Sequence, residues 1–142
     1  MGLVYAEIEL INGGDMEMAS RNLMDKDEVR HMQVNMLVDS GAYMMAINES
    51  IQELLQFRSK GKRKVRMADE SVVEYEVVGP IEVRFKNRSA TCNAFVLPGN
   101  SEPLLGVIPM EEMDVIILPL RQQLVVNPEN PDYAVLKMKS AS

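Results

Sequence analysis

Apolar and polar residues alternate along much of this chain, and this period of two limits the folds open to it more than any other feature. Successive side chains of an extended strand point to opposite faces, so the alternation is typical of strands with one buried and one solvated face. The pattern predicts strands at residues 6–10, 32–38, 73–77 and 81–85, with shorter ones at 92–97 and 123–126. Gly79 and Pro80 separate the third and fourth segments, which we expect to be two paired strands.

One segment has a clear helical pattern. Asn48 can cap its start, apolar residues recur at Ile51, Leu54 and Leu55, and Gly61 lies just past its end, about three turns later. A second, short helix can begin at Pro109, and residues 12–27 have no sustained period and are expected to be a long excursion between two strands. The sequence therefore predicts a mostly β fold with one or two short helices.

The length of 142 residues is that of one ordinary domain. We expect a single domain over residues 1–142 with its core at about 3–127. Prolines and polar residues dominate the start of the last segment, which predicts a loosely held tail at 128–142.

The charge balance bears on possible partners. The chain has 15 basic and 21 acidic residues and a net charge of −6, which repels phosphate backbones, so nucleic acid is not expected as a partner. One basic cluster at residues 58–64 could bind phosphate, although a solvated loop is the simpler interpretation. Without an apolar run of about 20 residues or a secretory signal, we expect no membrane contact and a cytoplasmic location.

Metal ligands are scarce. Cys92 is the only cysteine and His31 the only histidine, which excludes disulfide frameworks and cysteine-rich zinc sites. A cysteine–histidine nucleophile has no supporting motif. Glu111, Glu112 and Asp114 could suggest a cation site but suit a solvated helix face better. We expect no metal and no other cofactor.

The most informative point is the end of the apolar strand at residues 36–38. There the chain runs into Asp39-Ser40-Gly41-Ala42, so a carboxylate lies on a turn at a strand end. Glycine permits a tight turn and a close approach to a ligand, and a serine hydroxyl can fix the turn by hydrogen bonding. Alone, this tripeptide is a common turn, and only its context at fixed distances gives it meaning.

That context resembles the retropepsin-like aspartic proteases, the retroviral-type family with cellular and bacterial relatives, and most closely a bacterial-type member. In that family a hydrophobic strand enters Asp-(Thr/Ser)-Gly-Ala, a hairpin flap follows, and two apolar residues with a glycine precede a closing helix. The same order here covers roughly Val4 to Val126. The resemblance implies a closed β-barrel, half of a two-lobed acid protease.

The resemblance also implies residue roles. Asp39 is the catalytic aspartate, Ser40 braces the two catalytic loops across a dimer, Gly41 contacts substrate through its backbone, and Ala42 lines the cleft. The implied flap and substrate-binding residues are Met67, Ala68, Asp69, Glu70, Ser71, Val72 and Val73, and the residues supporting the loop are Leu104, Leu105 and Gly106.

The sequence departs from the family at three places. Retroviral members pair an acid just after the alanine with an arginine just after the later glycine, whereas Tyr43 and Val107 stand here, so the ion pair is replaced as a unit. Asp69-Glu70-Ser71 occupies the flap tip, where glycines often occur.

Aspartic protease chemistry needs two carboxylates that share a proton around one water. This chain has one Asp-Ser-Gly and about half the length of a two-lobed enzyme, so the second aspartate must come from a second copy. The sequence thus predicts a homodimeric aspartic endopeptidase acting on polypeptides. The main alternative is a binding or scaffolding module with the same fold and no activity, and a metal-dependent hydrolase is disfavoured by the scarcity of ligands.

Overall fold

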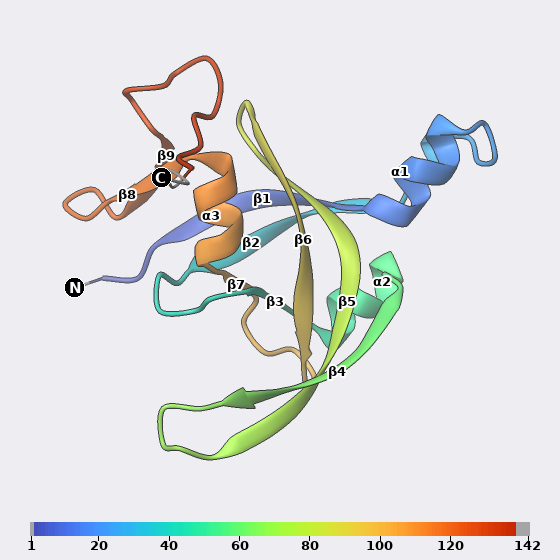
Figure 1. Ribbon diagram of the computed structural model, residues 1–142, viewed down its shortest axis with the longest axis horizontal. Coiled ribbons are helices and arrows are strands. Elements are labelled where there is room, and N and C mark those ends of the chain that lie inside the picture. The colour runs from blue at the N-terminus through green and yellow to red at the C-terminus, as the bar shows by residue number, and fades with distance from the viewer. Residues whose placement is uncertain (1, 139–142) are drawn as a thin grey trace.

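The computed structural model describes residues 2–138 (Figure 1). Within them lie nine strands, three α-helices and one short 3-10 helix at Lys26–Glu28. The strands are β1 (Tyr5–Asn12), β2 (His31–Val38), β3 (Met45–Asn48), β4 (Ser59–Arg66), β5 (Val72–Phe85), β6 (Arg88–Leu97), β7 (Leu104–Leu105), β8 (Val115–Leu118) and β9 (Gln123–Val126). The α-helices are α1 (Gly13–Ser20), α2 (Glu49–Leu55) and α3 (Val107–Met113). The predicted mostly β fold class is confirmed.

Seven strands form one curved sheet in the order β1-β2-β7-β3-β6-β5-β4, and β8 and β9 form a separate hairpin. The sheet bends far enough for β1 to pair with the second half of β5 as well, from Glu9 opposite Arg84 to Asn12 opposite Ile81. The strands thus form a ring, while β4 and the first half of β5 extend from it as an arm with β4 at the outer edge (Figure 1).

The core fills the inside of this ring. Many of its fully buried side chains come from the apolar positions of the alternating strands, such as Ile8 and Leu10 on β1, Met36 on β2 and Val83 on β5. The sequence pattern therefore identified the buried face of these strands correctly.

Two predictions about strands were wrong. Residues 73–85 form one strand and not a pair, because β5 continues through Gly79 and Pro80 with an irregular register between Val78 and Ile81. Proline is tolerated at such an irregularity since it needs no ladder hydrogen bond there. The basic cluster at 58–64 is exposed as predicted, but from Ser59 onward it is the strand β4 and not a loop.

The helices also differ from prediction. There are three in the described residues, not one or two, because residues 13–20 form α1. Helix α2 has only seven residues and ends at Leu55, where the following Gln56 is left-handed with φ of 49°. Gly61 lies within β4 and does not end the helix. Helix α3 starts at Val107, before Pro109.

A polar network fixes the excursion between β1 and β2. Asn12 caps α1 by accepting from the amide of Asp15 (3.0 Å), and its side-chain amide donates to the carbonyl of Leu55 (2.8 Å). The carboxylate of Asp15 is almost fully buried and accepts from Nε and Nη2 of Arg30 at 2.8 and 2.9 Å. These contacts stabilise α1 although two glycines begin it.

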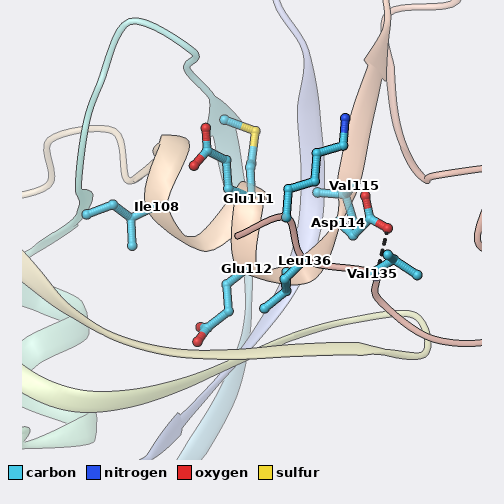
Figure 2. Close-up of a pocket in the computed structure, with 9 residues that line it drawn as sticks. Ile108, Glu111, Glu112, Asp114, Val115, Val135 and Leu136 are labelled. Carbon is cyan, nitrogen blue, oxygen red and sulfur yellow. Dashed lines mark hydrogen bonds between the residues drawn. The ribbon is translucent and has the colours of Figure 1, made fainter. Parts of the chain in front are cut away.

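Part of the C-terminal segment contacts the rest of the fold, and residues 139–142 of the predicted tail lie outside the described residues. Asp114, at the end of α3, accepts hydrogen bonds from the side chains of Asn127 (3.0 Å) and Asn130 (2.8 Å) and from the amide of Val135 (3.1 Å). The segment therefore folds back along α3 and β8, and together they line an open pocket of about 580 Å³ (Figure 2). None of the helices within residues 2–138 has the length and hydrophobicity needed to span a bilayer.

Candidate active site

Strand β2 carries Asp39 to the edge of the ring. Val38 pairs in parallel with Leu105 of β7, and the amide of Asp39 donates to the Leu105 carbonyl at 3.0 Å. Strand β7 also pairs with β3, through Leu104 and Ala46. It therefore lies between β2 and β3, the two strands that the Asp39 loop connects. The residues predicted to support the Asp39 loop thus lie directly against it.

The turn itself orients the carboxylate. Oδ1 of Asp39 accepts from the amide of Gly41 (2.9 Å), and the Asp39 carbonyl accepts from the amide of Ala42 (3.1 Å). Within residues 2–138 no donor bonds to the other carboxylate oxygen, Oδ2. Asp39 is half-buried, whereas Ser40 and Gly41 are exposed. The carboxylate therefore has one oxygen fixed by the loop and one available to a water, a substrate or a second carboxylate.

The start of α3 fixes the far end of the loop. The amide of Val107 donates to the Ala42 carbonyl (2.8 Å), and the amide of Ile108 donates to the Tyr43 carbonyl (3.0 Å). These backbone bonds join the segments of Tyr43 and Val107, where the sequence lacks an ion pair.

Gly106 lies where the backbones are closest. A β-carbon built on it would stand 2.3 Å from the Met44 carbonyl oxygen and 2.8 Å from that of Ala42. The sequence did not predict the contact between Gly106 and Met44, because the group in contact is a main-chain carbonyl, which no residue type signals. Met45 beside it is fully buried and fills the core.

The predicted flap is the tip of the β4–β5 hairpin, and the hairpin itself is confirmed. Arg66 pairs with Val72, the amide of Met67 donates to the Ser71 carbonyl (2.8 Å), and that of Glu70 to the Met67 carbonyl (3.0 Å). Glu70 adopts a left-handed conformation with φ of 72°. Glycine is favoured at a turn position with this conformation.

The acidic side chains of this tip have local partners. Ser71 donates to Asp69 through its hydroxyl and its amide, which lowers the pKa of that carboxyl. Glu70 lies 3.3 Å from the guanidinium of Arg66. The side chain of Val72 is exposed and that of Val73 is half-buried, so the hairpin presents apolar surface beside its charged tip.

A single chain brings only some of the predicted residues together. Asp39–Ala42 and Leu104–Gly106 form one hydrogen-bonded unit, whereas no hydrogen bond between described residues joins residues 67–73 to that unit. Both the loop and the hairpin tip point toward the left of the view in Figure 1. The pocket in Figure 2 lies between α3, β8 and the C-terminal segment, and Asp39 does not line it.

The other side chains considered as nucleophiles or cation ligands lie in surroundings that suit a structural role. Burial raises the pKa of Cys92 to about 12, which suppresses its thiolate, and His31 is exposed on β2 with Nδ1 3.3 Å from Glu9. Glu112 accepts from the amide of Thr91 (2.8 Å), and Asp114 binds the C-terminal segment. Among residues 2–138, no three His, Cys, Asp or Glu side chains gather as a metal site would require.

Comparison with known proteins identifies the family. Residues 28–111 match the family described as "gag-polyprotein putative aspartyl protease". The chain belongs to this aspartyl protease family. The matched region runs from the segment before β2 to the middle of α3, so it includes the Asp39 loop, the β4–β5 hairpin and β7. No curated protein matches the chain.

Proposed function

We propose that the protein is a homodimeric aspartic endopeptidase in which each chain supplies Asp39 to one active site. The observation that carries the proposal is the position of the Asp39 carboxylate, with Oδ1 held by Gly41 and Oδ2 without a partner in the described chain. A single carboxylate cannot act as both base and acid, so a second copy related by a two-fold axis must complete the site.

The proposed chemistry is that of a carboxylate pair about 3 Å apart, which holds one shared proton because both members cannot easily ionise. The ionised Asp39 takes a proton from a water whose oxygen attacks the scissile carbonyl carbon. The protonated Asp39 of the other copy donates its proton to the carbonyl oxygen. When the C–N bond breaks, the Asp39 that took the water proton gives a proton to the departing amine. The other Asp39 takes a proton from a hydroxyl of the tetrahedral intermediate as the carbonyl re-forms, so the pair again holds one shared proton.

The remaining predicted roles follow from this arrangement. Ser40 braces the loops across the dimer, Gly41 contacts substrate through its backbone, and Ala42 lines the cleft. The two hairpin tips at residues 67–73 act as flaps over an extended polypeptide, which binds as an added strand. The support of the loop by residues 104–106 agrees with their hydrogen bonds and close packing.

Substrate preference follows from the apolar surface around the proposed cleft. Ala42, Met67 and Val72 contribute apolar side chains, of which Met67 is flexible and can adapt to different partners. We therefore expect medium-sized hydrophobic residues on either side of the cleaved bond.

The assignment to a bacterial-type subgroup, the single domain over residues 1–142 and the cytoplasmic location stay predictions.

The experiment compares the purified protein with Asp39→Asn on a diverse pool of denatured peptides between about pH 4 and 7, with and without a transition-state-type aspartic protease inhibitor. The asparagine amide cannot accept the water proton, so cleavage should disappear. Asp132→Asn is the matched control because Asp132 is exposed and lies in the C-terminal segment, and it should cleave normally.

The pH profile adds a second readout, since only the pair with one shared proton has both its base and its acid. Activity should be bell-shaped and fall on both sides of an acidic optimum. Near-normal turnover by Asp39→Asn would remove Asp39 from the mechanism. Absence of cleavage by every form would favour the non-catalytic binding module.

A further inference from the structure

The arm of the molecule concentrates positive charge on strand β4 and on Arg58 just before it. Six of the 15 basic residues lie within residues 58–66, and this stretch contains no acidic residue. The rest of the chain therefore has nine basic and 21 acidic residues and a net charge of −12, whereas residues 58–66 carry a net charge of +6. We call this stretch the basic edge: Arg58, Lys60, Lys62, Arg63, Lys64 and Arg66.

The basic edge is also an open edge of the sheet. Strand β4 is last in the strand order and pairs only with β5, and the pairing is regular from Lys62 to Arg66 (Figure 1). Along its other side, the backbone N–H and C=O groups of β4 meet no strand within the described residues. An unpaired edge of this kind is a template for another strand.

The two faces of β4 differ. Lys62 and Lys64 lie opposite Glu76 and Glu74 on one face of the hairpin. On the other face, Arg63 lies opposite Tyr75, and Val65 lies opposite Val73. On its paired side, β4 thus already accommodates a strand in which glutamates alternate with apolar residues.

The charges of Lys62 and Lys64 remain available to a ligand. Arg66 forms an ion pair with Glu70, and no other basic side chain of the edge lies within 4.0 Å of a carboxylate in the part of the chain described. A strand added at the open side would lie about 4.8 Å from β4 and about twice that distance from the glutamates of β5. Its charges would therefore interact with lysine more strongly than with glutamate, within a screening length of about 8 Å.

We propose that the basic edge is a docking site for an extended polypeptide in which acidic residues alternate with apolar ones. The acidic side chains lie on the face of Lys62 and Lys64, and the apolar ones on the face of Val65. Backbone hydrogen bonds to β4 supply part of the affinity, and the alternation fixes the register. A second copy of β4 is disfavoured as the occupant because it would place lysine against lysine.

The test measures binding alone and uses the protein with Asp39→Asn, so that cleavage plays no part. The probe is a short fluorescent peptide that alternates glutamate with valine, and fluorescence anisotropy reports binding. Three further ligands are compared: the same composition in block order, the alternating peptide with lysine for glutamate, and the alternating peptide with N-methylated backbone amides.

We expect the alternating acidic peptide to bind and the other three to bind at least about tenfold more weakly. Adding Lys62→Gln and Lys64→Gln should weaken binding of the acidic peptide by about tenfold, because each exposed ion pair contributes modestly to the affinity. Lys26→Gln with Arg121→Gln removes two exposed charges elsewhere and should leave binding unchanged. In Lys62→Glu with Lys64→Glu, the lysine peptide should become the better ligand, which also shows that the arm is intact.

Several outcomes would overturn the proposal. Equal binding of the block-order or N-methylated peptide would mean charge attraction without strand addition. Tighter binding of a single-stranded oligonucleotide of equal charge would make the edge a phosphate site. If no peptide binds, the lysines only protect the edge from aggregation.

Discussion

Gly106 and Met44 are packed backbone to backbone, so closely that a β-carbon on Gly106 would stand 2.3 Å from the Met44 carbonyl oxygen. Real β-carbons do not approach oxygen this closely, and the group in the way is main chain, which cannot swing aside. The substitution Gly106→Ala should therefore displace the Asp39 loop and lower the free energy of unfolding by about 2 kcal/mol or more. Urea denaturation measures the change.

Gly99→Ala is the control for this prediction. Gly99 has φ of 58°, and a β-carbon on it would meet no atom within 4 Å, so its substitution adds backbone strain without a clash. It should cost about 1 kcal/mol. If Gly106→Ala costs no more than Gly99→Ala, the close packing of the loop against β7 does not constrain it.

The ion pair of Asp15 with Arg30 should make α1 sensitive to acid. Hydrogen bonds from Arg30 hold the pKa of the Asp15 carboxyl below its usual value, although burial opposes this. A carboxyl whose pKa is lowered by folding stabilises the protein fully above its unfolded pKa, near 4, and loses that contribution as the pH falls further. Unfolding measured from about pH 6 down to 3 should show this loss, and Arg30→Met should reduce it.

At neutral pH, Arg30→Met should cost about 2 kcal/mol because it leaves the buried Asp15 carboxylate without its charged partner. Arg21→Met removes a similar contact, 2.9 Å from Glu17, whose two side chains are 69% and 63% exposed. That exposed pair should contribute less than about 0.5 kcal/mol. Equal effects of the two substitutions would mean that burial of Asp15 adds nothing.

The elements that sequence could predict are those with one apolar and one polar face. Strands β1 and β2 alternate clearly, and Asn48 does cap α2 by accepting from the amide of Ile51 (2.9 Å). The turn at Asp39 was likewise visible, because it joins an apolar strand to a glycine.

The elements that sequence missed lack such a signal. Strand β4 is charged on both faces, and β3 is buried along its whole length, so neither alternates. Helix α1 begins with Gly13 and Gly14 and depends on distant contacts from Arg30 to Asp15. The contacts of the C-terminal segment with Asp114 have three donors that lie 13 to 21 residues away in the sequence.

The left-handed conformation of Glu70 predicts a stabilising substitution at the hairpin tip. A side chain at φ of 72° costs about 1 kcal/mol relative to glycine. Glu70→Gly should therefore slow amide hydrogen exchange along β4 and β5, despite loss of the exposed contact with Arg66. Glu70→Ala loses the same contact but keeps the strained conformation, so it should exchange faster. Similar exchange in both variants would contradict the assignment of strain.

Ser40→Ala should weaken the proposed dimer. The Ser40 side chain is exposed in the single chain and makes no hydrogen bond within the described residues, so its hydroxyl is free to bond to the loop of a second copy. Each hydrogen bond lost from such a buried junction costs about 1 kcal/mol, and two are lost per dimer, so the dissociation constant should rise by about tenfold or more. Sedimentation should find the unmodified protein at twice 16.0 kDa and the variant shifted toward monomer at the same concentration.

The control is Ser89→Ala, which changes an exposed serine on β6 and should leave the dimer unchanged. An unmodified protein that stays monomeric at high concentration yet cleaves peptides would refute the shared site, because one Asp39 would then perform both proton transfers.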